Sequence, residues 1–202
     1  GCNPNPAPCV KSYNSDQLAA LNYINTTLRP SHNIASVNMS LGGGSYASYC
    51  DATAGATKTA IDNLRSNGIA TIIATGNDGS SSTISSPACI STAIAVSSTS
   101  KVDIVSGFSN VATIMDLFAP GSGGAGGAPW DGGIASSVPG GWALMSGTSM
   151  ATPHVAGAYA VAKQAAPPFG IMTIQSASRT TFIERGSGKE SIPTTRADCS
   201  KR

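Results

Sequence analysis

Apolar side chains recur along this chain with the period of α-helices in three places. A first helix is predicted from Ser15, a candidate N-cap, to Pro30, with apolar positions at helical spacing: Leu18, Leu21, Ile24 and Leu28. A second helix, closed by Asn67-Gly68, carries an apolar stripe of Ala56, Ala60, Ile61 and Leu64. A third is predicted over Ser149–Lys163.

The segments between these helices predict strands. Ile69–Thr75 is almost continuously apolar, which is typical of a strand buried on both faces of a parallel sheet. A shorter strand at Ala35–Ser40 runs into three glycines, and residues 121–133 form a loop; further strands are predicted at Ala93–Val96 and Val111–Phe118. The order strand, helix, buried strand predicts an α/β fold with a mainly parallel sheet flanked by helices. Functional sites in such folds lie at the carboxyl ends of the strands.

Composition excludes several classes of protein. The chain has 202 residues, of which 41% are hydrophobic and 11% charged, with a net charge of +2. This hydrophobic share argues against disorder, no apolar run is long enough for a membrane helix, and 12 Lys and Arg residues form no basic stripe for nucleic acid. We expect neither membrane nor nucleic acid as a partner. We expect one domain portion over residues 1–166 and a divergent or loosely attached tail over residues 167–202.

The five cysteines indicate the cellular compartment in which the protein resides. None has zinc-ligand spacing, and a chain rich in Ser, Thr, Gly and Asn fits an oxidising compartment better than the cytosol. We therefore expect a secreted, extracellular protein. The expected disulfides are Cys2–Cys9 and Cys50–Cys89, with Cys199 left over, and buried free thiols are the alternative.

Two segments carry candidate chemistry. Asn77 follows the predicted buried strand, where its amide could donate to a developing oxyanion, although an Asn before Asp-Gly is also a common turn residue. Ser149 begins the last predicted helix, where it could act as a nucleophile or as an ordinary N-cap. Residues 121–126 fit Gly-x-Gly-x-x-Gly, but no helix is predicted after them, so they indicate a surface loop rather than a nucleotide site.

Residues 147–157 (Gly-Thr-Ser-Met-Ala-Thr-Pro-His-Val-Ala-Gly) resemble throughout the serine-nucleophile motif of the subtilase family, the subtilisin-like serine proteases. Residues 38–43 (Asn-Met-Ser-Leu-Gly-Gly) are similar to the family's substrate-binding strand, and residues 74–77 (Ala-Thr-Gly-Asn) to its oxyanion-hole segment. Two further blocks, residues 108–110 and 118–121, follow in the expected order. The resemblance covers about residues 15–166 and implies a serine endopeptidase.

The resemblance implies a role for each matching residue. Ser149 would be the nucleophile, and Asn77 would donate to the oxyanion together with the backbone N–H of Ser149. The segment Ser40, Leu41 and Gly42 would pair with the substrate backbone, and Ala74, Thr75 and Gly76 would help to wall a wide pocket for large apolar P1 residues. No cofactor is required for the chemistry. Asp116 stands where some subtilases bind structural calcium, which makes it a weak candidate ligand.

The general base and its orienting carboxylate are not recognised in the chain. Its two histidines are His32, in a loop context, and His154, on the last predicted helix, and neither has the His-Gly-Thr setting of the family's base. No Asp-Ser-Gly or Asp-Thr-Gly segment occurs either. We therefore expect the catalytic His and Asp upstream, in a missing N-terminal part of the same domain, and little activity from this chain alone. The alternative is a catalytically inactive subtilase-like domain that binds extended peptides.

Overall fold

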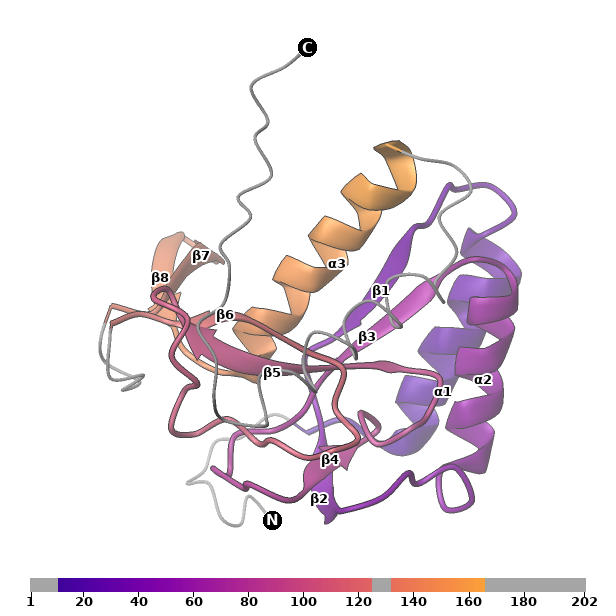
Figure 1. Cartoon of the computed structure of the whole chain (residues 1–202). Helices are drawn as coiled ribbons and strands as arrows, with labels where there is room; N and C mark the ends of the chain where they lie inside the picture. Colours follow the sequence, from indigo (N-terminus) through magenta and orange to yellow (C-terminus); the bar gives the residue numbers. More distant parts are fainter. Residues whose placement is uncertain (1–10, 125–131, 166–202) are drawn as a thin grey trace.

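A computed structural model describes residues 11–124 and 132–165, with a parallel sheet at its centre (Figure 1). Four strands lie in the order β1-β3-β5-β6, and every neighbouring pair is parallel. Their bounds are β1 Ser36–Met39, β3 Ala70–Ala74, β5 Ile94–Ser100 and β6 Leu117–Ser122. The α/β fold with a mainly parallel sheet is confirmed.

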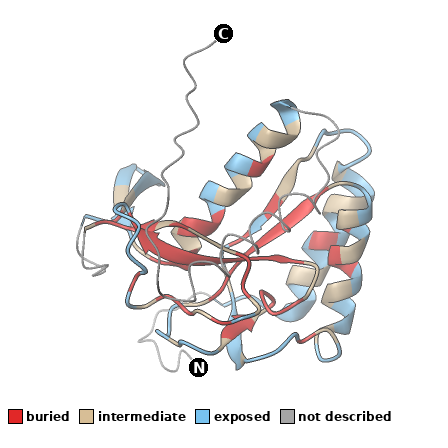
Figure 2. Cartoon of the chain, in the orientation of Figure 1, coloured by how far each residue is buried: buried red, intermediate tan, exposed pale blue. Residues whose placement is uncertain are grey.

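Helices cover both faces of the sheet. On one face lie α1 (Asn14–Tyr23), its π-helical continuation η1 (Ile24–Leu28) and α2 (Gly55–Ser66), and on the other lies α3 (Thr148–Ala165). All five residues of β3 are buried (Figure 2). Because successive strand side chains point to opposite faces, Ile73 packs in the core beneath α1 and α2, whereas Ile72 packs in the core beneath α3.

Two antiparallel pairs complete the described structure. β2 (Gly43–Tyr46) pairs with β4 (Ile84–Ser86), and β7 (Ile134–Val138) pairs with β8 (Gly141–Met145). Neither pair was predicted from the sequence. β8 leads directly into α3, and β2 follows the loop after β1, so both pairs flank the carboxyl end of the sheet.

The structure corrects some predicted boundaries. The strand predicted at Val111–Phe118 is wrong, because the sixth strand begins at Leu117, opposite Val96. The residues before it make other backbone contacts instead: the N–H of Val111 donates to Ser80 O in a distant segment, and that of Met115 donates to Ala112 O in a turn. Ser15 is not the N-cap of the first helix, since α1 begins at Asn14 and the backbone oxygen of Tyr13 accepts its first hydrogen bonds.

Candidate active site

Ser40, Asn77 and Ser149 meet at the carboxyl end of the sheet. Ser40 follows β1, Asn77 follows β3 after a two-residue turn, and Ser149 is the second residue of α3. The Ser40 hydroxyl donates to the backbone oxygen of Ser149 at 2.8 Å, and the Ser149 hydroxyl donates to the backbone oxygen of Ser40 at 3.4 Å. The structure thus brings the candidate nucleophile against the candidate substrate-binding strand.

The carboxamide of Asn77 is held by Thr148, the residue before Ser149. Its Oδ1 accepts hydrogen bonds from the Thr148 backbone nitrogen at 2.8 Å and from the Thr148 hydroxyl at 2.9 Å. The backbone N–H, which can only donate, identifies this atom as the oxygen. The opposite atom, Nδ2, has no hydrogen-bond partner among the described residues, and Asn77 is exposed. Asn77 therefore presents a free neutral donor at the surface.

The backbone nitrogen of Ser149 is a second free donor. The first N–H groups of a helix lack intrahelical acceptors, and within residues 11–124 and 132–165 that of Ser149 has no partner. A Cβ added to Gly147 would lie 3.4 Å from Asn77 Nδ2 and 3.6 Å from Ser149 N. One position beside Gly147 is therefore near both donors, an arrangement suited to an anionic oxygen at a helix N-terminus.

The two segments expected to wall a P1 pocket lie next to each other. A Cβ added to Gly42 would lie 3.8 Å from the backbone oxygen of Ala74 and 3.0 Å from Cβ of Ser85. Leu41 packs against the core, and Thr75 is fully buried, with its backbone N–H bonded to Val96 O. Gly76 has a φ of +109°, which only glycine adopts readily, and it turns the chain from β3 toward Asn77.

Neither histidine is placed to act on Ser149. His154 lies five residues further along α3, which rotates it about 140° around the helix, and its Nδ1 is bonded to Met150 O at 2.8 Å. His32 lines a surface pocket together with Lys163. Lys163 is fourteen residues beyond Ser149 on α3, about 21 Å along the helix axis. This placement agrees with the expectation that neither histidine is the general base.

Asp116 lies apart from these residues, directly before β6 and hydrogen-bonded to Ala95 of β5. It is 2% exposed, and its Oδ2 accepts the backbone N–H of Ala95 at 2.9 Å. Calcium prefers six to eight oxygen ligands, and no group of three or more His, Cys, Asp or Glu side chains that could hold a metal occurs in the described part of the chain. The Asp116 carboxylate already accepts a backbone hydrogen bond, which makes it a weak candidate ligand for calcium. Calcium binding stays a prediction.

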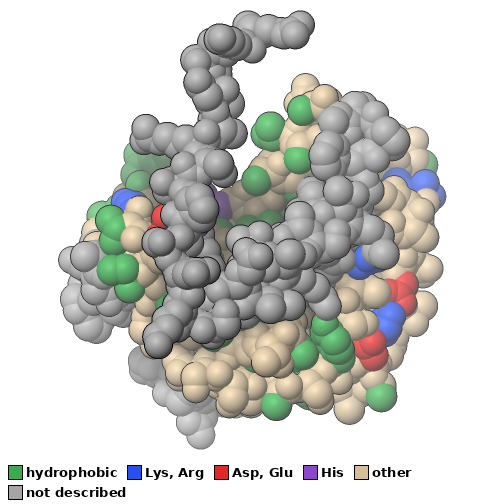
Figure 3. Space-filling view, in the orientation of Figure 1, with side chains coloured by type: hydrophobic (Ala, Val, Ile, Leu, Met, Phe, Trp, Pro, Cys, Tyr) green, Lys and Arg blue, Asp and Glu red, His purple; other side chains and the backbone are tan. Residues whose placement is uncertain are grey.

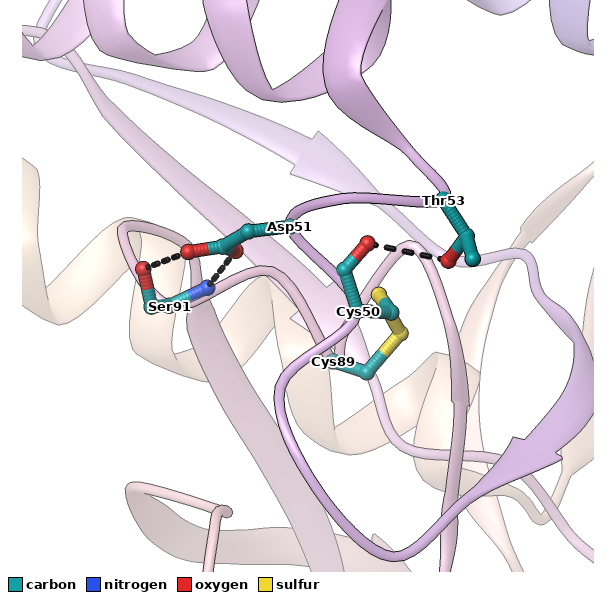
Figure 4. The surroundings of a disulfide bond; sticks show 5 residues. All are labelled: Cys50, Asp51, Thr53, Cys89 and Ser91. Atoms are coloured by element: carbon teal, nitrogen blue, oxygen red, sulfur yellow. Dashed lines mark hydrogen bonds between the residues drawn. A yellow bond between two sulfur atoms is a disulfide. The ribbon is translucent and has the colours of Figure 1, made fainter.

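One of the two expected disulfides, Cys50–Cys89, is present (Figure 4). Cys50 and Cys89 are bonded, with 5.4 Å between their Cα atoms, and link the chain after β2 to the chain after β4. Both residues are almost fully buried, and the Cys50 N–H donates to Cys89 O. The Cys50–Cys89 prediction is confirmed, whereas Cys2, Cys9 and Cys199 lie outside the described residues.

Sequence reasoning missed two residues that shape this site. Thr148, 0% exposed, fixes the Asn77 carboxamide, and its one signal in the sequence was its place directly before the predicted helix start at Ser149. Asn110, 2% exposed, bonds the loop that carries Asn77. Its position within a family block was noted, but no local pattern indicates that a residue 33 positions away contacts the Asn77 loop.

The fold and site define a class of α/β protein in which a serine and two converging N–H donors lie at a helix N-terminus. The sequence model of the subtilase family matches residues 9–195. This chain belongs to the subtilase family. No helix in the described residues has the length and apolarity needed to cross a membrane.

Several relatives agree with this assignment. The chain is 34% identical to Subtilisin-like protease 2 of Pseudogymnoascus destructans and 36% identical to the extracellular serine proteinase of a Thermus species, covering 71% and 73% of this chain and 32% of each relative. It is 35% identical to subtilisin of Bacillus pumilus, covering 78% of this chain and 52% of that one. This chain thus spans 32% to 52% of these relatives' lengths.

Solved structures give the same result. A cold-adapted subtilisin-like serine proteinase matches 82% of this chain and 54% of its own, with a TM-score of 0.63 and 31% identity. A protease from Pseudoalteromonas arctica matches 84% of this chain and 52% of its own, with a TM-score of 0.70 and 31% identity.

Proposed function

We propose that this chain carries the nucleophile and the oxyanion donors of a serine endopeptidase. The observation that carries the proposal is the convergence of Asn77 Nδ2 and Ser149 N beside Gly147, next to the Ser149 hydroxyl. Such donors stabilise charge that develops in the transition state of acyl transfer. Membership of the subtilase family and the names of the relatives support the same chemistry.

In this mechanism Ser149 Oγ bonds to the carbonyl carbon of the scissile peptide as its proton passes to a general base. The carbonyl electron pair moves onto the oxygen, which accepts hydrogen bonds from Asn77 Nδ2 and Ser149 N. When the carbonyl re-forms, the C–N bond breaks and the amine leaves with the proton from the base. Water then attacks the acyl ester in the same way, which releases the acid and restores Ser149.

Protein or peptide substrates would bind as extended chains between two segments. The backbone of Ser40, Leu41 and Gly42 would pair with the substrate, a mode largely indifferent to its side chains. Ala74, Thr75 and Gly76 would form the facing wall. Gly42 and Gly76, one in each segment, carry no side chain that would narrow the space for large apolar P1 residues, so we propose a broad specificity. We also propose an extracellular role, in line with the extracellular serine proteinase among the relatives.

The base and its orienting carboxylate would be a histidine and an aspartate from outside these 202 residues. In subtilisin, a member of the same family, loss of the serine or of the histidine lowers kcat about 10⁶-fold, or roughly 8 kcal/mol of transition-state stabilisation. We therefore propose that the 202-residue chain alone hydrolyses peptides too slowly to be useful. Its partner in catalysis would be the remaining part of the same domain.

The proposal is tested by peptide hydrolysis with the complete gene product that contains this chain. We expect Ser149→Ala to abolish turnover, and Asn77→Ala to lower kcat about 10²–10³-fold, the size found for an oxyanion donor of subtilisin. Ser82→Ala, which removes an exposed hydroxyl from a nearby loop, should leave kcat unchanged. Saturable binding of an extended peptide without hydrolysis would support the inactive peptide-binding domain instead.

A further inference from the structure

A buried asparagine, Asn110, organises the loop that carries Asn77. This loop, residues 75–80, is here called the Asn77 loop. Asn110 is 2% exposed and lies between β5 and β6, a segment of the chain remote from the loop in sequence. It nevertheless contacts four of the six residues of the Asn77 loop: Thr75, Gly76, Asp78 and Ser80.

The side chain of Asn110 uses its whole hydrogen-bonding capacity on this loop. Its Oδ1 accepts the backbone N–H groups of Asp78 at 2.9 Å and of Ser80 at 3.1 Å. Its Nδ2 donates to the backbone oxygen of Thr75 at 3.2 Å and to Oδ2 of Asp78 at 3.1 Å. Two acceptor and two donor contacts thus clamp the loop on either side of Asn77.

Backbone contacts extend this clamp. The N–H of Asn110 donates to Gly76 O at 3.0 Å, and its carbonyl oxygen accepts the buried hydroxyls of Thr75 at 2.9 Å and Ser97 at 2.7 Å. A side chain at Gly76 would collide with Asn110 Nδ2, so the loop and the asparagine fit together only with glycine at that position.

Asn110 makes no described hydrogen bond to Asn77 itself and is too buried to reach a substrate. The rotation of the Asn77 carboxamide is set by Thr148, whereas its Cα is carried by a loop whose flanking backbone is bonded to Asn110. We propose that Asn110 is a positioning residue, which places Asn77 Nδ2 at the oxyanion distance. The proposal rests on the oxyanion role of Asn77 proposed above.

The chemistry of the four contacts makes a carboxamide necessary. An aspartate could still accept from the Asp78 and Ser80 nitrogens, but its second oxygen would face the Thr75 carbonyl and the Asp78 carboxylate, which repel it. A serine is too short to span both sides of the loop. Either change should move Asn77 while the fold survives, because other contacts of the loop do not involve the Asn110 side chain, among them Gly79 N to Phe108 O and Val111 N to Ser80 O.

The test is a double-mutant cycle in the complete gene product, with Asn110→Asp, Asn77→Ala and both together. We expect Asn110→Asp to lower kcat about 10–100-fold, because small displacements of catalytic groups have effects of this size, with KM within about twofold. In the Asn77→Ala background the same change should lower kcat less than about threefold, because the donor it positions is gone. Asn110→Ser should give the same loss of kcat, and it replaces Asn110→Asp in the cycle if that variant does not fold.

A matched control separates positioning from loss of stability. Ser106 lies in the same β5–β6 connection, is 1% exposed, and bonds the hydroxyls of Ser98 and Ser122 instead of the Asn77 loop. Ser106→Ala should lower the melting temperature yet leave kcat near wild type. Hydrogen exchange at the amides of Asp78 and Ser80 should accelerate in Asn110→Ser and not in Ser106→Ala.

The outcomes separate the two proposals. If Asn77→Ala keeps the wild-type kcat, the oxyanion role fails and the inference fails with it. If Asn77→Ala loses kcat while Asn110→Asp and Asn110→Ser keep it, only the inference is overturned. Losses that multiply in the double variant would also overturn it, because Asn110 would then act independently of Asn77.

Discussion

Thr148 donates both its backbone N–H, at 2.8 Å, and its hydroxyl, at 2.9 Å, to Oδ1 of Asn77. These bonds decide which end of the Asn77 carboxamide is free, because they hold the oxygen and leave the NH₂ group outward. The residue that precedes the candidate nucleophile thus orients the side-chain donor of the candidate oxyanion hole. Ser149 N, one residue further on, is the backbone donor, so one helix N-terminus organises both.

Removal of the Thr148 hydroxyl should weaken transition-state stabilisation without preventing folding. Thr148→Val keeps the shape and the backbone bond but loses two hydrogen bonds of the hydroxyl, the one to Asn77 Oδ1 and the one from Gly76 N. At about 1 kcal/mol each, we expect kcat to fall roughly 5- to 30-fold. Thr148→Ser keeps the hydroxyl and should stay near wild type. Steady-state kinetics on a peptide substrate measure both, and equal activities would contradict an orienting role for the hydroxyl.

A methyl group at Gly147 should block the space between the donors. The added Cβ would meet Asn77 Nδ2 at 3.4 Å and Ser149 N at 3.6 Å, ordinary contact distances that permit folding. It would however compete with an oxyanion, which must approach such donors to about 2.7–3.1 Å. We expect Gly147→Ala to retain its melting temperature and to lose at least as much kcat as Asn77→Ala. Wild-type kcat in this variant would show that the oxyanion binds elsewhere.

Gly76→Ala should destabilise the protein. Gly76 has a φ of +109°, and an added Cβ would collide with the side chains of Asn110 and Ser85. An alanine there is therefore both strained and crowded, at a cost of about 1–3 kcal/mol or more. Gly43→Ala is the matched control, since no atom lies within 4 Å of its added Cβ and its φ is not positive. Urea unfolding of the two variants should give a clearly lower midpoint for Gly76→Ala only.

Loss of the Cys50–Cys89 bond should reduce stability more than any single surface contact. The bond closes a separation of 39 residues, and cross-links of this loop length stabilise by about 2–4 kcal/mol. The double variant Cys50→Ser/Cys89→Ser should therefore unfold at lower urea concentration, and reduction of the wild type under denaturing conditions should produce the same shift. An unchanged midpoint would mean that the surrounding core alone holds β2 and β4 together.

Asp62 on α2 should contribute stability that depends on pH. Burial raises its pKa, but hydrogen bonds from Lys58 and Thr92 and the charges of Lys58 and Arg65 outweigh this and hold the pKa below its ordinary 3.8. A carboxylate with a lowered pKa stabilises above its unfolded pKa, and this contribution is lost as pH falls through the folded one. Asp62→Asn should therefore lower the urea midpoint at neutral pH, and the difference should vanish in strong acid.

Charged residues make up 11% of the sequence, and few of them show on the described surface in Figure 3. The buried interior consists instead of apolar strand residues and hydrogen-bonded hydroxyls. The β3 strand was predictable because Ile72 and Ile73 continue an unbroken apolar run. The end of β6 was not, because Gly121 and Ser122 fall in the loop predicted over residues 121–133. They join the sheet since Ser122 bonds the buried Ser106 hydroxyl, and Gly121 fits against Ser98 and Gly147 where no side chain would.

The residues of the site that stand in local sequence motifs were predictable, whereas the residues that act through tertiary contacts were not. Ser149 and Asn77 each stand in a motif whose chemistry can be read from neighbouring residues. Their common environment depends on Thr148 and Asn110, which act through contacts across 71 and 32 residues of sequence. No periodicity or turn pattern records such distant pairs, which is why the support of the Asn77 loop emerged only from the structure.

The most direct test of the account is covalent labelling of Ser149. The complete gene product should be treated with a fluorophosphonate, digested, and analysed by mass spectrometry, alongside Ser149→Ala. We expect the label on the peptide that contains Ser149, and no label in the variant. A label that persists in Ser149→Ala, or a wild-type protein that hydrolyses peptides without labelling at Ser149, would contradict the assignment of the nucleophile.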